Sequence, residues 1–238
     1  MNNQSIEWPE ISTNTQDNHK EYTSFEWTNF DYFNGVVKYL QEKNIKSFID
    51  LGGCTGEVSN IILQKVPTIE YGLIFEPYPN NYQYILENVS LDKVRVENKA
   101  VFYGKENLTL SIDWTNIGAW SFLFAENHPE KSFDVECVSL DPYLKEKKYD
   151  FIKIDIEGSE YNILENSELL KEVEFIELEI HYEHFERYQK QNNLSGYDSA
   201  YDFVLKHLPN HEVYYFCCRQ EWEVKNNTPG NIFLIKKS

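Results

Sequence analysis

The chain has 238 residues, enough for one large domain or two small ones with a sizeable buried core. Hydrophobic residues make up 41% and charged residues 26%, which excludes a disordered or fibrous protein. Acidic residues outnumber basic ones by 39 to 22, and the formal net charge of −17 disfavours nucleic acid and anionic membrane surfaces as partners, although a local basic patch would escape this argument.

Neither a signal peptide nor a membrane span is indicated by the hydropathy of the sequence, and we expect a cytoplasmic protein. The four cysteines lack CxxC spacing, and adjacent Cys217 and Cys218 cannot easily bridge each other. The sequence therefore predicts free thiols and neither a disulfide framework nor a zinc site.

The first half of the chain alternates helices with strands. Residues 1–22 are polar with little periodicity, so we expect a flexible N-terminal arm ahead of one domain over residues 23–238. In chain order, the patterns predict a helix at 33–44, a strand at 46–51, a helix at 57–66, a strand at 69–77, a helix at 79–89 and a short strand with an exit loop at 93–102.

Residues 107–138 fit no simple alternation, and we expect extra short strands and a loop over the edge of the sheet. Strands alternating with helices predict an α/β fold with a doubly wound, mostly parallel sheet, whose last strand turns back antiparallel because no helix precedes it. The later elements are a helix at 140–148, a strand at 149–156, a helix at 159–173, a strand at 174–181, a helix at 197–208 and strands at 212–218 and 230–237.

A glycine-rich turn follows the first strand. Gly52, Gly53 and Gly56 would let the backbone approach a ligand, and the next helix offers unpaired N–H groups at its positive end. Ligands bind at this edge of an open parallel sheet. Glu76 ends the second strand, 20 residues past Gly56, where a carboxylate reaches a ribose diol. We therefore expect a nucleotide-like cofactor.

Asp50, just before this turn, distinguishes two cofactor classes. The dinucleotide fingerprint would place glycine where Cys54 stands, and it usually has no acid there because the turn accepts an anionic pyrophosphate. S-adenosylmethionine has a cationic amino-acid end, which a carboxylate can orient directly or through water. Together with the antiparallel last strand, a feature of class I methyltransferase sheets, this favours S-adenosylmethionine over a nicotinamide cofactor.

A second group of polar residues interrupts the apolar strand at 149–156. Lys153 and Asp155 are two apart and face one way, and Glu157 begins the turn that follows. A central parallel strand is normally apolar throughout, so we expect these charges to converge at its carboxyl edge. Lys153 should form a salt bridge with Asp155 or Glu157, since a buried lysine needs a countercharge.

The stretches SFIDLGGCTGEVS, LIFEPYPNNYQYILEN, NKAVFYG, VECVSLDPYL and YDFIKIDIEGSEYNIL occur in this order between about Ser47 and His181. Together they resemble the FkbM family of S-adenosylmethionine-dependent methyltransferases. The resemblance implies a Rossmann-like class I methyltransferase fold and O-methylation of a hydroxyl on a sugar, a glycan or a related small molecule. The family usually has Ala-Asn where this chain has Gly53-Cys54, and the resemblance carries over no particular acceptor.

The resemblance also implies roles for individual residues. Asp155 is the first candidate for the base or acceptor-orienting residue, although it could only bond the methionine end or the turn; His181 is the second, although it could be a solvent-facing residue at a strand end. Glu157 would also stand at the transfer site. The implied cofactor-binding residues are Asp50, Gly52, Gly53 and Gly56 at the methionine end, Glu76 at the ribose, Asn98 and Ala100 beside the adenine, and Asp155.

No metal ligand is predicted, although Asp155, Glu157 and Glu179 could converge on a divalent metal. The polar, aromatic run over 181–197 is expected to be a loop or broken helix that shapes the acceptor pocket. The pocket contacts expected there are His184 and Tyr188, and the insertion offers Trp114 and Trp120 for stacking on a sugar or for packing.

Other functions fit the sequence less well. Methylation of a nitrogen or a protein acceptor is the runner-up, and the sequence does not exclude it because the transfer geometry is the same. A nicotinamide-dependent oxidoreductase is disfavoured by Asp50 and Cys54, and an inactive methyltransferase-like binding protein is disfavoured by the presence of Asp50, Glu76 and Asp155. The sequence does not indicate an oligomeric state.

Overall fold

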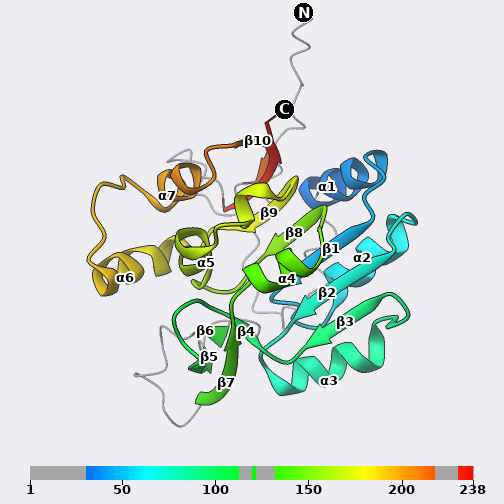
Figure 1. Cartoon of the computed structure of the whole chain (residues 1–238), viewed down its shortest axis with the longest axis horizontal. Coiled ribbons are helices and arrows are strands. Elements are labelled where there is room, and N and C mark those ends of the chain that lie inside the picture. Colours follow the sequence, from blue (N-terminus) through cyan, green and yellow to red (C-terminus); the bar gives the residue numbers. More distant parts are fainter. Residues whose placement is uncertain (1–30, 113–119, 122–131, 218–229, 238) are drawn as a thin grey trace, which may run out of the picture.

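The computed structural model describes residues 31–112, 120–121, 132–217 and 230–237. These residues form a seven-stranded sheet with helices on both faces and, beside it, a smaller four-stranded sheet (Figure 1). The predicted N-terminal arm and Trp114 lie outside the described residues. None of the helices in the described ranges is long and apolar enough to cross a membrane.

The elements follow the predicted alternation. Pro79 occupies the first turn of α3, where its missing N–H costs nothing, and Ser199 caps α7 by accepting the Asp202 N–H at 3.1 Å. The helices are α1 (Asp31–Glu42), α2 (Glu57–Lys65), α3 (Pro79–Asn88), α4 (Asp141–Glu146), α5 (Glu160–Asn166), α6 (Tyr182–Asn192) and α7 (Ala200–His207). The strands are β1 (Ser47–Leu51), β2 (Tyr71–Phe75), β3 (Val94–Glu97), β4 (Ala100–Val101), β5 (Asn107–Ile112), β6 (Trp120–Ser121), β7 (Ser132–Val138), β8 (Phe151–Ile154), β9 (Phe175–Glu179), β10 (His211–Cys217) and β11 (Asn231–Lys236).

The large sheet has the strand order β3-β2-β1-β8-β9-β11-β10. Strands β3 to β9 in this order pair in parallel, and β11 is antiparallel to both β9 and β10. The predicted mostly parallel, doubly wound sheet with an antiparallel C-terminal strand is therefore confirmed. From β1 the chain leads outward to β2 and β3 on one side, and after the small sheet it returns to the other side of β1 as β8. The turns after β1 and β8 therefore meet at the point where the strand order reverses.

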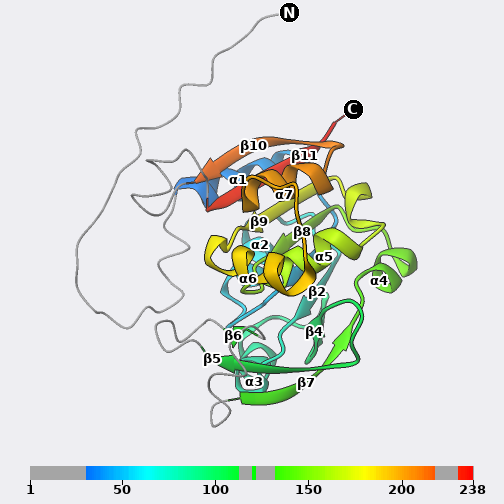
Figure 2. The ribbon, with the colours of Figure 1, turned by 90° about the vertical axis from the view of Figure 1, so that its left-hand side faces the viewer.

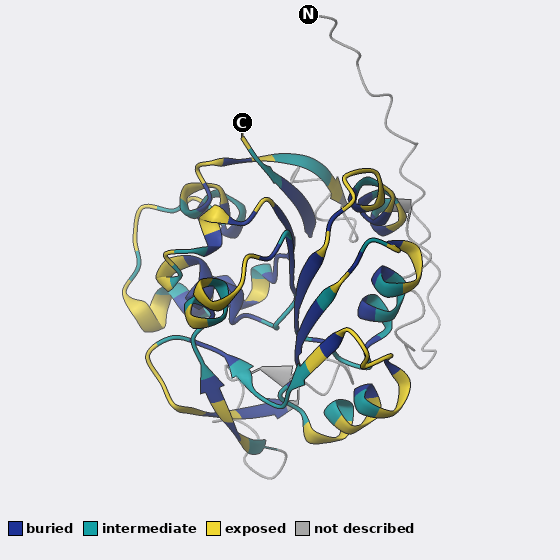
Figure 3. Cartoon of the chain, turned by 45° about the vertical axis from the view of Figure 1, so that its right-hand side comes forward, coloured by how far each residue is buried: buried dark blue, intermediate teal, exposed yellow. Residues whose placement is uncertain are grey.

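Each face of the large sheet carries its own layer of helices, α1 to α3 on one face and α4 to α7 on the other (Figures 1 and 2). Side chains alternate between the two layers: Phe48 and Phe151 pack with α1, α2 and α3, whereas Ile49 and Ile152 pack with α5, α6 and α7. The central strands are buried on both faces, as Figure 3 shows. Both faces therefore demand apolar residues, and charged residues in these strands need a specific explanation.

The small sheet has the order β4-β7-β5-β6. It confirms the extra short strands predicted within residues 107–138. Its own core includes Phe102, Leu108, Leu110 and Val135. The Phe133 ring lies 5.4 Å from the Tyr78 ring, measured between centroids, which places β7 beside the segment that follows β2.

The segment at 93–102 divides between the two sheets, because β3 belongs to the large sheet and β4 to the small one. Asn98 lies at the division. Its side-chain amide donates to the carbonyl oxygens of Glu76 (2.9 Å) and Pro77 (3.0 Å), which holds the exit from β3 against the exit from β2.

Two later predictions of helix extent are wrong. The helix predicted over 159–173 ends at Asn166, because Ser167 takes an extended conformation and its hydroxyl donates to Asp141 Oδ1 at 2.5 Å; a short 3-10 helix, Leu170–Glu172, follows. The run expected to be a loop or broken helix contains the continuous α6, which ends where Asn193 adopts a left-handed conformation (φ 53°).

Candidate active site

The turn after β1 lies directly against the turn after β8. Gly52 has a φ of 83°, and a Cβ built on it would lie 1.8 Å from the backbone oxygen of Asp155. The Asp155 N–H donates to the Leu51 oxygen at 3.0 Å. Glycine at position 52 is therefore required by the close approach of two backbone segments at the carboxyl edge of the sheet.

The other two glycines of this turn are also fixed by protein neighbours. A Cβ on Gly53 would lie 2.3 Å from Ile74 Cγ2, and one on Gly56 would lie 2.5 Å from Val89 Cγ2. Gly56 also has a φ of 80°, a conformation that favours glycine. Packing against β2 and the end of α3 thus accounts for both residues, and their contact with a cofactor stays a prediction.

Glu76 follows β2 and faces the glycine turn. Its Oε2 accepts the Cys54 N–H at 2.7 Å, and its Oε1 accepts the Tyr78 N–H at 2.8 Å. The side chain is buried, and burial raises the pKa of Glu76 to about 8 although both N–H donors oppose the rise. Asn98 fixes the backbone of Glu76 from the other side, and Ala100 begins β4; their contact with a cofactor stays a prediction.

Asp50 lies one residue inside β1 and is fully buried, so it is enclosed rather than open at the mouth of the strand. Its Oδ2 accepts the Ser59 hydroxyl of α2 at 2.6 Å. Its Oδ1 lies 3.6 Å from Lys153 Nζ and has no hydrogen-bond partner among the described residues.

Lys153 connects Asp50 to the next turn. Its Nζ lies 3.2 Å from Asp155 Oδ2, which confirms the predicted salt bridge. Burial opposes the charged form of the lysine, yet Asp155 and Asp50 raise the pKa of Lys153 well above its ordinary value. The lysine is therefore a buried cation held between two carboxylates.

Polar residues continue from Lys153 into β9 and β11. Lys153 pairs in register with Glu177, whose Oε1 accepts the Asn231 side-chain amide at 3.2 Å and the Tyr32 hydroxyl at 3.4 Å. Burial raises the pKa of Glu177 to about 8, although Lys153 opposes the rise. Asp50, Lys153, Glu177 and Asn231 together form a buried polar row across four strands.

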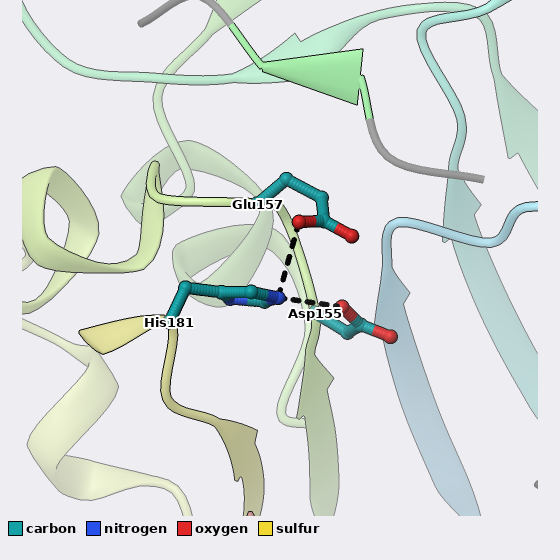
Figure 4. Close-up of side chains that lie close together, drawn as sticks. All are labelled: Asp155, Glu157 and His181. Carbon is teal, nitrogen blue, oxygen red and sulfur yellow. Dashed lines mark ion pairs between the residues drawn. The ribbon is translucent and has the colours of Figure 1, made fainter. Parts of the chain in front are cut away.

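Asp155, Glu157 and His181 converge at the carboxyl edge of β8 and β9 (Figure 4). His181 Nε2 lies 3.2 Å from Glu157 Oε2 and 3.9 Å from Asp155 Oδ1. Glu157 adopts a left-handed conformation (φ 51°) that turns the chain above the strand end. The two carboxylates are partly exposed, at 23% for Asp155 and 20% for Glu157, so a small ligand can reach them.

Glu160 fixes the imidazole of His181. Its Oε1 lies 3.1 Å from His181 Nδ1 and accepts the His181 backbone N–H at 3.2 Å, while its Oε2 accepts the Gly158 N–H at 2.7 Å. A further carboxylate oxygen, Glu179 Oε1, lies 3.4 Å from Nε2. Burial disfavours the charged ring, but Glu157 and Glu160 raise the pKa of His181 well above its ordinary value. Burial raises the pKa of Glu157 to about 7, with His181 opposing and Asp155 adding to the rise.

Of the two predicted acceptor contacts on α6, His184 lies beside the Asp155–Glu157–His181 cluster and Tyr188 lies in the core. His184 Nε2 lies 3.9 Å from Glu157 Oε2, beside the cluster, and burial lowers the pKa of His184. Tyr188 is buried in the core against Tyr161, and its hydroxyl donates to Glu165 at 2.6 Å. The prediction of Tyr188 as a pocket contact is therefore wrong, because the residue packs between helices.

Ser59 and Glu160 are two functional residues that the sequence pattern does not identify. Each is an ordinary polar residue near the start of a helix, where a serine or an acid is common on local grounds alone. Their partners, Asp50 and His181, come from β1 and the end of β9, so only the assembled fold shows the contacts.

Comparison with known proteins agrees with this fold. Residues 50–215 match the family model of the methyltransferase FkbM domain. Among curated proteins, none matches the chain significantly. The strand order, with an antiparallel strand inserted beside the last parallel one, is that of class I methyltransferases.

Solved structures with similar folds include methyltransferases of several kinds. Methyltransferase FkbM from Methylobacillus flagellatus KT is 13% identical, with 81% of this chain and 44% of that chain covered and a TM-score of 0.48. The methyltransferase domain of bacterial CtHen1-C is 10% identical (87% and 97% covered, TM-score 0.49). Trm1 from Pyrococcus horikoshii, solved with S-adenosyl-L-methionine, is 13% identical (87% and 54% covered, TM-score 0.46).

This chain thus spans less than half the length of the Methylobacillus protein. The family match, by contrast, covers most of this chain and includes the glycine turn, Glu76 and the Asp155–Glu157–His181 cluster. The chain therefore belongs to the FkbM family of S-adenosylmethionine-dependent methyltransferases.

Proposed function

We propose that the protein transfers a methyl group from S-adenosylmethionine to a hydroxyl oxygen of a sugar, a glycan or a related small molecule. The observation that carries the proposal is the convergence of Asp155, Glu157 and His181 next to the glycine turn. A hydroxyl must lose its proton as its oxygen is methylated, and the partly exposed carboxylates of this cluster can accept a proton.

The residues around the turn fit the cofactor. S-adenosylmethionine supplies an electrophilic methyl group on a sulfonium, and it also carries an ammonium group and a ribose diol. Glu76 offers a carboxylate at the end of β2 for the ribose hydroxyls. Asp50 is enclosed beside Lys153, its Oδ1 has no hydrogen-bond partner among the described residues, and the carboxylates near it suit a cationic ligand.

Different side chains of the site have different proposed roles in the reaction. Asp155 is held by Lys153 and is partly exposed, so it can orient the acceptor hydroxyl or take its proton. His181, the second candidate, is fixed in one ring orientation by Glu160; its raised pKa favours the protonated ring, which can orient an acceptor rather than take its proton. Alignment of the acceptor oxygen with the methyl group depends on the rigid approach of the two turns at Gly52.

The direct test is incubation of the purified chain with S-adenosylmethionine and a panel of sugars that have free hydroxyls. Release of S-adenosylhomocysteine would be followed by chromatography, and NMR would locate the new methyl group. A methyl on oxygen, lost in Asp155→Asn, supports the proposal. Transfer only to amines or to protein side chains would contradict it, and so would a failure to bind S-adenosylhomocysteine.

A further inference from the structure

We infer that Asp155, Glu157 and His181 form a binding site for a divalent metal ion. Each residue offers one ligand atom, and these atoms lie within 4.8 Å of one another. The turn after β8 supplies both carboxylates and the segment after β9 supplies the imidazole, so the donors lie at the ends of two adjacent strands (Figure 4).

The orientation of His181 is the second observation. Its Nδ1 faces the fully buried Glu160, which is itself held by the N–H groups of Gly158 and His181. Because an ionised carboxylate can only accept, Nδ1 carries the ring proton and donates it to Glu160, and Nε2 is directed toward the carboxylates. Metal-binding histidines almost always donate their other ring N–H to such an outer carboxylate or carbonyl.

Several carboxylate acceptors surround Nε2. Carboxylate oxygens of Glu157, Glu179 and Asp155 lie 3.2, 3.4 and 3.9 Å from this one atom. A proton on Nε2 makes one good hydrogen bond, whereas a divalent cation is coordinated by several donors at once. The alternative is a protonated His181 without a metal ion, and the absence of saturable Mn²⁺ binding would establish it.

The donor set selects the kind of metal. Two carboxylates and one imidazole combine hard oxygen ligands with a borderline nitrogen, a mixture that suits Mn²⁺ better than Ca²⁺ and leaves positions open for water or a substrate hydroxyl. An ion in this place would bind the acceptor hydroxyl and favour its ionisation. That last step rests on the proposed function, whereas binding of the ion does not.

The test measures Mn²⁺ binding by the full chain after treatment with a chelator, without cofactor or acceptor. Calorimetry should show one saturable site, and the electron paramagnetic resonance signal of free Mn²⁺ should decrease with the same stoichiometry. Glu157→Gln and Asp155→Asn should each weaken binding at least about tenfold, and Glu160→Gln about 10- to 100-fold through the misplaced imidazole. Circular dichroism would verify that each variant is folded.

Glu186→Gln is the matched control, because this glutamate lies on α6 with 81% of its side chain exposed. It should bind Mn²⁺ as the unchanged protein does. The inference fails if no saturable binding occurs, or if Glu157→Gln and Asp155→Asn bind as tightly as the control. S-adenosylhomocysteine binding by the metal-free protein is measured separately, so failure of the metal site is distinguishable from failure of the proposed function.

Discussion

Gly52 is the position where one methyl group should have the largest effect. In Gly52→Ala the new Cβ would lie 1.8 Å from the backbone oxygen of Asp155, an atom that cannot rotate away. Gly104 provides the matched control: its φ of 84° is nearly the same as the 83° of Gly52, but a Cβ there has no atom of the described residues within 4 Å. The two substitutions share the conformational cost and differ only in the steric overlap.

The expected magnitudes follow from these two geometries. Alanine at positive φ costs roughly 1–2 kcal/mol, which is the full effect expected for Gly104→Ala. At Gly52 the two backbones must also separate by about 1.5 Å, which adds overpacking of about 1–3 kcal/mol or more. The separation strains the hydrogen bond from the Asp155 N–H to the Leu51 oxygen, 3.0 Å in length and worth about 0.5–1.5 kcal/mol. Gly52→Ala should therefore be less stable than Gly104→Ala by roughly 2–4 kcal/mol.

Urea unfolding followed by circular dichroism measures both free energies of unfolding under one set of conditions. A second readout is S-adenosylhomocysteine binding at a temperature where both variants are folded, and only Gly52→Ala should weaken it because only this change displaces the turn. Equal destabilisation of the two variants would show that the turns after β1 and β8 do not meet as described.

Three further predictions concern the charged residues. Glu177→Gln should flatten the dependence of the free energy of unfolding on pH. The carboxyl has a folded-state pKa of about 8 against an ordinary 4.5, so its stabilising contribution is fully present below about pH 4.5 and is lost as pH rises through 8. In urea unfolding, the variant should therefore gain several kcal/mol relative to the original protein between about pH 5 and pH 9. Parallel profiles would contradict this. Lys153→Met should cost about 3–5 kcal/mol, because it leaves buried Asp50 without its cation; a cost below about 1 kcal/mol would mean that the pair is not formed. Glu76→Ala should raise the dissociation constant for S-adenosylhomocysteine, whereas Asp155→Asn should lower kcat more than binding, and equal loss of binding in both would refute the separate roles.

Much of the fold follows from local patterns. Alternating apolar runs, the glycine turn and the absence of a helix between the last two strands were sufficient for the sheet and its antiparallel strand. The division between β3 and β4 was missed because it depends on Asn98 reaching two carbonyl groups of another segment. The early end of α5 likewise depends on Asp141, 26 residues before Ser167 in the chain.

Part of the candidate site also follows from the sequence, and part depends on contacts between distant segments. Side-chain alternation along one strand places Lys153 and Asp155 on one face, and their salt bridge follows from that spacing. The enclosure of Asp50 does not follow, because strand ends are inferred to within a residue or two and this residue lies just inside. Nor does the contact of Glu160 with His181, which joins a helix to the end of a different strand.

The buried polar row has a consequence for how related sequences can diverge. Asp50 and Lys153 lie in register on neighbouring strands, and a neutral residue at position 153 leaves the carboxylate of Asp50 without its cation in the interior. Single replacements of Lys153 should thus be rare, and relatives with an apolar residue at position 153 should also have lost the acid at position 50. These two positions are expected to covary across the family, even where the acceptor has changed, whereas position 177 should tolerate a neutral residue.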